Sequence, residues 1–296
     1  MREVSYEDYK RFFELHDYVV IGNTKIPLRK NKITKFSPSS FVPESTTVWS
    51  FPERGDWATH YGDYRGNWSP YIPRNLILRY TKKGDLVLDQ MVGSGTTLIE
   101  CKLLHRRGIG VDINPNAIML TRNRLDFDYR LCNQEETEIK TYVGDARHLD
   151  LIADESVDLI ATHPPYMDVI PYSRGLIEGD LSNIRNIDEF IKEINKVAEE
   201  CFRVLKSGKY CAILVGDIRR HKHFIPLATR ILQGFLEVGF ILKEDIIKLQ
   251  WNMKSTREKW SGVHDFLLIV HEHLYVFRKP EKGENLSKLS GSIKWW

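Results

Sequence analysis

The sequence places two prolines between a histidine and a tyrosine at the point where an apolar run ends. The run VDLIAT, residues 157–162, predicts a buried strand, and His163, Pro164, Pro165 and Tyr166 follow it directly. Because proline has no N–H, this turn presents carbonyl oxygens without competing donors. Such acceptors can hold the hydrogens of an amine whose lone pair is delocalised into a ring, and so help it attack an electrophilic carbon. Tyr166 adds a face on which a base can stack. We therefore predict a catalytic turn, with a merely rigid turn as the alternative.

A second turn combines glycines with an acidic residue. The segment VLDQMVGSGTT, residues 87–97, ends a predicted strand at Asp89 and opens a helix after Gly93 and Gly95. Glycines let the backbone approach a ligand closely, and the first turn of a helix leaves N–H groups free. The loop fits neither GxxxxGK[ST] nor GxGxxG, so it favours an adenosine that carries an amino-acid tail over a phosphate ligand. The alternative is a packing turn whose acids cap helices.

Two further acids end the next two predicted strands. Asp112 lies 23 positions after Asp89, where its carboxylate can accept hydrogen bonds from two ribose hydroxyls, and Asp145 can meet an adenine amine. Because the carboxyl ends of parallel strands share one edge of a sheet, the three acids predict a cofactor pocket. The cofactor-binding residues predicted from these turns are Asp89, Met91, Gly93, Ser94, Gly95, Thr96, Thr97, Asp112, Ile113, Asp145 and Ala146.

Regular alternation of strands and helices begins near residue 85 and must position these turns. We predict strands at 85–89, 109–113, 140–143, 157–162 and 210–215, and helices at 96–106, 115–125, 187–205 and 224–238. This alternation indicates an α/β fold with a parallel sheet. The β-rich stretches 241–251 and 265–277, joined by a polar segment, predict an antiparallel hairpin at one edge. Residues 38–75 show no helical period, which predicts a long irregular arm.

Composition narrows the class of protein. The 296 residues carry a formal net charge of +3, which permits a polyanionic partner without requiring one. The four cysteines have no CxxC pairing and no nearby histidine at ligand spacing, so we expect neither a zinc site nor a disulfide framework, and no metal. No run of eighteen apolar residues occurs, so we expect no membrane association and a soluble protein of a prokaryotic cytoplasm or nucleoid.

Together the motifs resemble those of the DNA amino-methyltransferases, which modify cytosine at N4 or adenine at N6. The resemblance covers about residues 48–279: VLDQMVGSGTT is similar to the first cofactor motif and HPPY to the catalytic tetrapeptide. Asp112 resembles the ribose acid and Asp145 the adenine-binding acid. The segment NWSPYIPRNLILRYTKKGD resembles the motif that closes over the methionine end of the cofactor, which adds Asn67, Ser69 and Pro70.

This resemblance implies a class I, Rossmann-like methyltransferase fold with a mostly parallel seven-stranded sheet that includes an antiparallel edge hairpin. It also implies S-adenosyl-L-methionine as the cofactor, double-stranded DNA as the partner, flipping of the target base, and direct methyl transfer. Residues 1–80 would form an N-terminal arm for cofactor closure and DNA contact, 81–280 the catalytic domain, and 281–296 a flexible tail. A cognate restriction endonuclease and a homodimer fit the same family pattern.

Two departures from the family pattern matter. The tetrapeptide begins with His163, where the family has Asp, Asn, Ser or Thr; a neutral imidazole accepts a hydrogen bond but a protonated one does not, so activity should fall at acid pH. No long recognition domain is visible, so short basic and aromatic pieces must contact DNA. The predicted DNA-binding residues are Arg54, Tyr64, Arg65, Tyr172, Ser173, Arg174, Lys254, Arg257 and Lys259. Solvated polar loops are the alternative for each piece.

The target remains open at this point. The SPY, GSGTT and HEHLYVFRK segments look closer to cytosine members, which favours cytosine N4 over adenine N6. Other enzymes with PPY turns on this fold methylate guanine amines of RNA or glutamine amides of proteins. A non-catalytic partner subunit, in which His163 marks a lost active site, is the reading from a different class.

Overall fold

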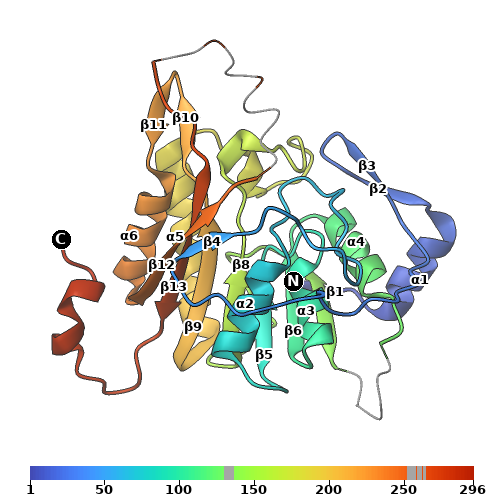
Figure 1. The fold of residues 1–296 in the computed structure, drawn as a ribbon, viewed down its shortest axis with the longest axis horizontal. Helices are drawn as coiled ribbons and strands as arrows, with labels where there is room; N and C mark the ends of the chain where they lie inside the picture. The colour runs from blue at the N-terminus through green and yellow to red at the C-terminus, as the bar shows by residue number, and fades with distance from the viewer. Residues whose placement is uncertain (130–136, 252–257, 259–261, 263–264) are drawn as a thin grey trace.

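The computed structural model describes residues 1–129, 137–251, 258, 262 and 265–296. Among these residues the main sheet has nine strands, in the order β1-β7-β6-β5-β8-β9-β13-β12-β4 (Figure 1). The strands, in sheet order, are Arg2–Glu3, Ile139–Val143, Arg107–Asp112, Leu86–Asp89, Val157–Thr162, Leu205–Val215, His271–Arg278, Ile241–Leu249 and Val48–Ser50. Strands β7, β6, β5, β8 and β9 pair in parallel, in that sheet order. Strand β13 is antiparallel to both of its neighbours, and β1 is antiparallel to β7. The predicted α/β class with a mostly parallel sheet is confirmed.

The sheet is wider than the seven strands predicted. Strands β1 and β4 extend it at its two edges, and the pairing of Val48–Ser50 with residues 247–249 takes the β12–β13 hairpin away from the edge. The predicted edge position of this hairpin is therefore wrong. The two extra strands have only two and three residues, too few for a period-2 pattern to emerge in the sequence.

Helices cover both faces of the sheet. Helices α2 (Tyr71–Tyr80), α3 (Thr96–Leu103) and α4 (Pro115–Leu125) belong to one apolar cluster, and α5 (Ile187–Val204) and α6 (Leu227–Val238) belong to another (Figure 1). The central strands contribute side chains to both clusters, because successive side chains of a strand point to opposite faces. All six residues of β8 are buried, as expected for a parallel strand with helices on either side.

Most predicted boundaries lie within a few residues of those observed, and α4 and β8 agree with their predicted ranges. Two elements begin later. Strand β13 begins at His271 rather than at 265, and α6 begins at Leu227 rather than at 224. The second difference arises because His223–Ile225 form β11, which pairs with β10 (Ile218–Arg220), and Pro226 then opens the helix.

The N-terminal residues are more regular than the predicted arm. Helix α1 (Tyr6–Leu15) begins with a capping box between Ser5 and Asp8, and β2 (Tyr18–Ile21) pairs with β3 (Thr24–Pro27). This hairpin was not predicted, although the Gly-Asn pair at 22–23 between its two strands is a known turn signal. The two long segments without helix or strand in this part of the chain are 28–47 and 51–70.

The C-terminal residues, predicted to form a flexible tail, include a 3-10 helix η3 at Leu286–Ser292. Arg278 donates two hydrogen bonds to the carboxylate of Glu284, at 2.9 and 2.5 Å, which ties the start of this segment to the end of β13. Across the described ranges, no helix combines the length and the apolar character that crossing a membrane would require.

Candidate active site

A pocket opens at the carboxyl ends of the parallel strands, beside α3 and the residues that precede α2. It holds about 820 Å³ of empty space, part of it open to solvent, within the range of ligand pockets. The lining residues are Tyr64, Gly66, Asn67, Trp68, Asp89, Gln90, Met91, Val92, Gly93, Ser94, Thr96, Asp112, Ile113, Asn114, Asp145, Ala146, His163, Pro165, Tyr172, Gly179, Asp180 and Leu181.

Asp89 joins three elements beneath the glycine-rich loop. Its carboxylate accepts hydrogen bonds from the hydroxyl of Thr97 on α3, at 2.5 Å, and from that of Thr162 on β8, at 3.0 Å. Burial raises the pKa of Asp89 to about 6, although these hydroxyls oppose the shift. Gly93 and Gly95 have φ values of +53° and +83°, and a Cβ on Gly95 would lie 2.9 Å from the Thr121 side chain. The loop therefore requires glycine for both its conformation and its close packing.

Asp112 faces the pocket from the end of β6. It accepts hydrogen bonds from the backbone N–H groups of Gly93 and Asn114, both at 2.9 Å, so each carboxylate oxygen keeps a free lone pair. Burial raises the pKa of Asp112 to about 7, and the neighbouring carboxylates of Asp180 and Asp89 add to the shift. An exposed pair of acceptors of this kind suits a diol.

Asp145, at the end of the next strand, is held by Arg147. The Nε atom of Arg147 donates to Asp145 Oδ1 at 2.9 Å, and Nη2 donates to Oδ2 at 2.6 Å. Arg147 also contacts Glu193 on α5 and donates to the carbonyl of Gly179 at 2.8 Å. Burial alone would raise the pKa of Asp145, but the hydrogen bonds and charge of Arg147 lower it, so this acid remains an anion in the pocket.

The His-Pro-Pro-Tyr turn leaves β8 beside these acids. His163 and Pro165 line the pocket, whereas Pro164 and Tyr166 do not. The His163 ring stacks on Trp68 with 5.8 Å between centroids, and burial lowers its pKa to about 4. The imidazole therefore stays neutral down to about pH 4. A loss of activity through protonation of His163 is expected only near that pH. The Tyr166 ring lies against Gly216, where an added Cβ would come within 2.6 Å of it.

Residues before α2 close one side of the pocket. Asn67 donates to the carbonyl of Tyr61 at 3.1 Å and to the Ser94 hydroxyl at 3.4 Å, and so ties this segment to the glycine-rich loop. Ser69 and Pro70, predicted to bind cofactor, lie just outside the pocket lining. The lining also omits two more predicted residues, Gly95 and Thr97, which act instead through the loop conformation and through Asp89.

A buried carboxylate anchors the same segment to α3. Glu100 accepts hydrogen bonds from Trp57 Nε1 at 2.7 Å and from Arg74 Nη1 at 2.8 Å, and the His60 ring nitrogen Nε2 lies 2.8 Å from it. The Glu100 and His60 side chains are fully buried. Trp57 and His60 of the closing segment and Arg74 of α2 therefore depend on one acid, Glu100, which was not among the predicted residues.

Eight of the nine residues predicted to contact DNA divide into three groups, and the ninth, Tyr172, lines the pocket. Arg54, Tyr64 and Ser173 are withdrawn from the surface: the Arg54 guanidinium donates to the carbonyl of Trp68 at 2.8 Å, Tyr64 stacks on Tyr172, and Ser173 bonds with Asn183. These three side chains pack within the loops around the pocket, and a role for them in DNA contact stays a prediction. Arg65 and Arg174 are exposed. Lys254, Arg257 and Lys259 lie outside the described residues.

Several lining residues were not predicted. Trp68 sits inside the NWSP motif, and Gln90, Val92 and Asn114 flank predicted residues, so proximity alone could have found them. Gly66 precedes the same motif. Gly179, Asp180 and Leu181 come from the segment before α5, and no local pattern marks that segment.

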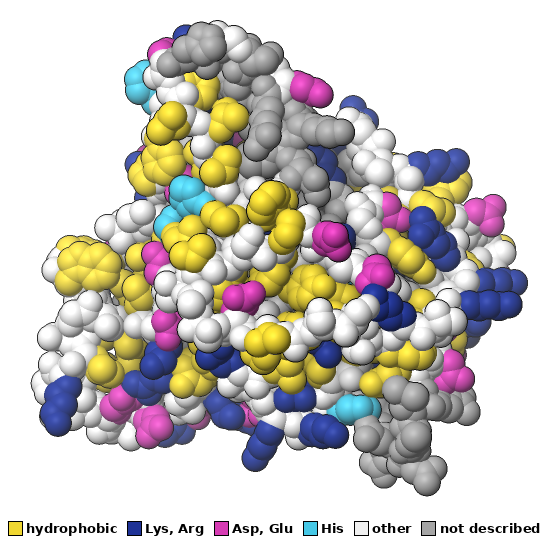
Figure 2. All heavy atoms as spheres, viewed as in Figure 1, with side chains coloured by type: hydrophobic (Ala, Val, Ile, Leu, Met, Phe, Trp, Pro, Cys, Tyr) yellow, Lys and Arg dark blue, Asp and Glu magenta, His cyan; other side chains and the backbone are white. Residues whose placement is uncertain are grey.

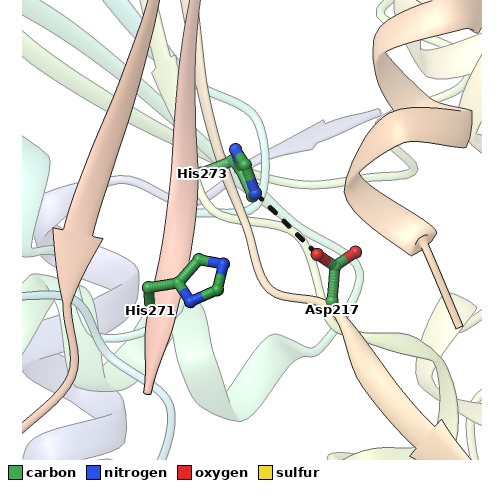
Figure 3. Close-up of side chains that lie close together, drawn as sticks. All are labelled: Asp217, His271 and His273. Carbon is green, nitrogen blue, oxygen red and sulfur yellow. Dashed lines mark ion pairs between the residues drawn. The ribbon is translucent and has the colours of Figure 1, made fainter. Parts of the chain in front are cut away.

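A cluster of two histidines and an acid lies near the end of β9 (Figure 3). Asp217, His271 and His273 each offer one ligand atom within 4.8 Å of the others. His273 Nδ1 lies 2.9 Å from Asp245 and Nε2 lies 3.8 Å from Asp217, and both acids raise the pKa of His273, with the Asp245 hydrogen bond the largest cause. Asp217 also accepts from Ala228 N at 2.9 Å, in the first turn of α6. The two acids therefore favour the charged form of His273.

The sheet order, with a nucleoside-type pocket at the carboxyl ends of its parallel strands, defines a class I methyltransferase fold. The sequence profile of the DNA methylase family matches residues 6–123 and 157–292, and the chain belongs to this family.

Individual relatives match shorter stretches. The chain is 30% identical over 136 residues to the Type II methyltransferase M.BglI of Bacillus subtilis, which covers 46% of this chain and 37% of that protein. It is 29% identical over 171 residues to M.BglII of the same organism, covering 51% and 44%. It is also 38% identical over 104 residues to a tRNA (guanine(10)-N2)-dimethyltransferase of Methanothermobacter thermautotrophicus, covering 35% and 29%. The chain thus spans less than half the length of each of these relatives.

Solved structures resemble parts of the chain. A putative DNA modification methylase from Thermus thermophilus, complexed with S-adenosyl-L-methionine, is 26% identical with a TM-score of 0.36 and covers 50% of this chain and 58% of that one. A SAM-dependent methyltransferase from Methanosarcina mazei is 17% identical with a TM-score of 0.47, covering 70% and 97%.

Proposed function

We propose that the protein is a DNA methyltransferase that transfers the methyl group of S-adenosyl-L-methionine to the exocyclic amine of a base in duplex DNA. The observation that carries this proposal is the shared pocket: His163 and Pro165 of the catalytic turn line the same cavity as Asp112 and the glycine-rich loop. Membership of the DNA methylase family supports DNA as the substrate.

The cofactor is S-adenosyl-L-methionine, and the pocket fits it. The two free lone pairs of the Asp112 carboxylate suit the ribose hydroxyls, and the anionic Asp145 suits an adenine amine. The negative charges around the pocket favour a ligand that carries a sulfonium. The bound cofactor supplies an electrophilic methyl group. Asn67 and Ser94, which bond to each other, are suited to hold the methionine end, together with Ser69 and Pro70 behind them.

The catalytic turn acts on the target amine. The bound cofactor would supply its methyl carbon to the amine nitrogen, with the carbon–sulfur electron pair leaving on the thioether sulfur and the proton lost by the amine passing to solvent. His163 and the carbonyl oxygen of Pro165, which both line the pocket, accept the two hydrogen bonds that the amine can donate, and so make its lone pair more available as charge develops. Trp68 stacks on His163 and, with Tyr172, gives the pocket aromatic walls beside the turn, where a flipped base can be held.

DNA contacts are proposed at the pocket rim. Arg65 and Arg174 are exposed, and they adjoin Tyr64 and Ser173, which fold into the pocket region. Figure 2 shows Lys and Arg side chains interspersed with acidic and hydrophobic ones on one face of the molecule. Lys254, Arg257 and Lys259 stay in the proposal from the sequence alone. A cognate endonuclease and a homodimer are further proposals from the family pattern.

Cytosine N4 is the proposed target, with adenine N6 as the alternative, because the SPY, GSGTT and HEHLYVFRK segments resemble cytosine members. A guanine amine of RNA is a second candidate, favoured by the 38% identity to a tRNA guanine-N2 dimethyltransferase over 104 residues.

The test is to incubate the protein with methyl-labelled cofactor and, separately, unmodified duplex DNA, transfer RNA and a glutamine-rich protein. The products are digested and the labelled nucleoside or residue is identified by mass. Labelled N4-methylcytosine supports the full proposal, and N6-methyladenine replaces the base while keeping the mechanism. Label in RNA or protein, or no label despite cofactor binding, refutes DNA methylation.

A further inference from the structure

A chain of hydrogen bonds leads from His163 to a buried ion pair on the β12–β13 hairpin. His163 Nε2 lies 2.7 Å from the Tyr166 hydroxyl, which lies 2.8 Å from Glu272 Oε1. Lys248 Nζ donates to the other Glu272 oxygen at 2.8 Å. The exposed fractions of the Glu272 and Lys248 side chains are 8% and 15%, so little water competes with this chain.

The direction of each hydrogen bond follows from the charges. Burial alone would raise the pKa of Glu272, but the charge of Lys248 lowers it, so Glu272 is a carboxylate. A carboxylate only accepts hydrogen bonds, so the single hydroxyl proton of Tyr166 points to Glu272. The Tyr166 oxygen can then only accept from His163, and Nε2 must carry the ring proton. Because burial keeps His163 neutral, Nδ1 is left with a lone pair.

Nδ1 is the free nitrogen of a ring that lines the pocket, and it has no hydrogen-bond partner among the described residues. We propose that Glu272, with Lys248, is a positioning residue that fixes the tautomer of His163, so that Nδ1 accepts a hydrogen bond from the target amine. This inference rests on the proposed function. It also explains how histidine can replace the oxygen acceptor that begins the family tetrapeptide. A neutral imidazole can carry its proton on either nitrogen, and this chain of hydrogen bonds, the relay, leaves Nδ1 as an acceptor.

Glu272→Gln is the sharpest variant, because it keeps the shape and reverses the relay. Lys248 only donates, so the new amide must turn its oxygen to Lys248 and its NH₂ group to Tyr166. The Tyr166 hydroxyl then donates to His163 Nε2, and the ring proton moves to Nδ1. The acceptor becomes a donor that opposes the amine. Glu244→Gln, on strand β12 of the same hairpin, is the matched control, since Glu244 contacts neither His163 nor Tyr166 in the described structure.

The experiment measures the tautomer and the activity separately. Nitrogen-15 spectra of histidine-labelled protein distinguish protonated from unprotonated ring nitrogens, and His163→Gln assigns the signals. The wild type is expected to carry the proton on Nε2 and Glu272→Gln on Nδ1, at pH 7 and without DNA. The kcat of Glu272→Gln is expected to fall about 100-fold, with a cofactor Kd within error of Glu244→Gln and a lower melting temperature, because Lys248 loses its anion.

A wild-type spectrum with the proton on Nδ1 overturns the proposal, and so does a Glu272→Gln enzyme with unchanged kcat. A fall in kcat with an unchanged tautomer also overturns it, because Glu272 would then act otherwise. The spectra need no methyl transfer, so a wild-type protein inactive on DNA refutes the proposed function while the relay is still tested.

Discussion

Cofactor binding should weaken steeply as pH falls from 8 to 6, because Asp112 loses its charge in this range. Burial raises the pKa of Asp112 to about 7, and only the ionised form offers free lone pairs on both oxygens to the ribose hydroxyls. At pH 8 about nine tenths of the free protein carries the ionised acid, and at pH 6 about one tenth does. Because the apparent Kd is the intrinsic Kd divided by the competent fraction, the Kd should rise about tenfold.

The assay is titration calorimetry of the free protein with S-adenosyl-L-methionine at pH 6, 7 and 8, with Asp112→Asn as the control. The variant lacks one ribose hydrogen bond to a charged acceptor, which weakens binding by about 10- to 150-fold, and it should bind equally at the three pH values. A wild-type Kd constant from pH 6 to 8, or a pH dependence that survives in Asp112→Asn, would refute the assignment of Asp112 to the ribose.

Three further outcomes are expected. Glu100→Gln should lower the free energy of unfolding by about 3 kcal/mol in urea titrations, since it leaves a buried arginine and its neighbours without their anion; a loss under 1 kcal/mol would contradict this role. Gly216→Ala should displace the Tyr166 ring, which an added Cβ would approach to 2.6 Å, and should lower kcat at least tenfold while the cofactor Kd measured by calorimetry stays constant; equal losses in both would point to general damage. Arg65→Ala and Arg174→Ala should each reduce the slope of log K against log salt for DNA binding by about 0.9; an unchanged slope for both removes them from the interface.

The sequence could predict those parts of the site that lie next to strand ends. Asp89, Asp112 and Asp145 follow recognisable strands, and all three line one pocket because parallel strands bring their carboxyl ends to one edge. Residues whose role depends on distant contacts could not be predicted in this way. Glu272 meets Tyr166 across 106 positions of sequence, through the hairpin that pairs with β9.

The burial of loop side chains could not be predicted from the sequence either. The segment around Tyr64 looked like an exposed mixture of basic and aromatic residues, yet the Tyr64 ring packs 3.3 Å from the position of a Cβ on Gly93. A loop between elements has no periodicity, so its sequence does not indicate which side chains turn inward. Short strands such as β1 and β4 were not predicted, because they are too short for a period and form by pairing with longer neighbours.

The most direct test of the central claim uses DNA from a host strain that lacks its own base methylation. The strain expresses either the wild-type chain or His163→Ala, and its genomic DNA is digested and analysed by mass spectrometry. Methylation of an exocyclic amine, as N4-methylcytosine, is expected with the wild type, with a loss of at least 100-fold in the variant. Genomic DNA without any amine-methylated base, from cells that contain folded wild-type protein, would contradict the account.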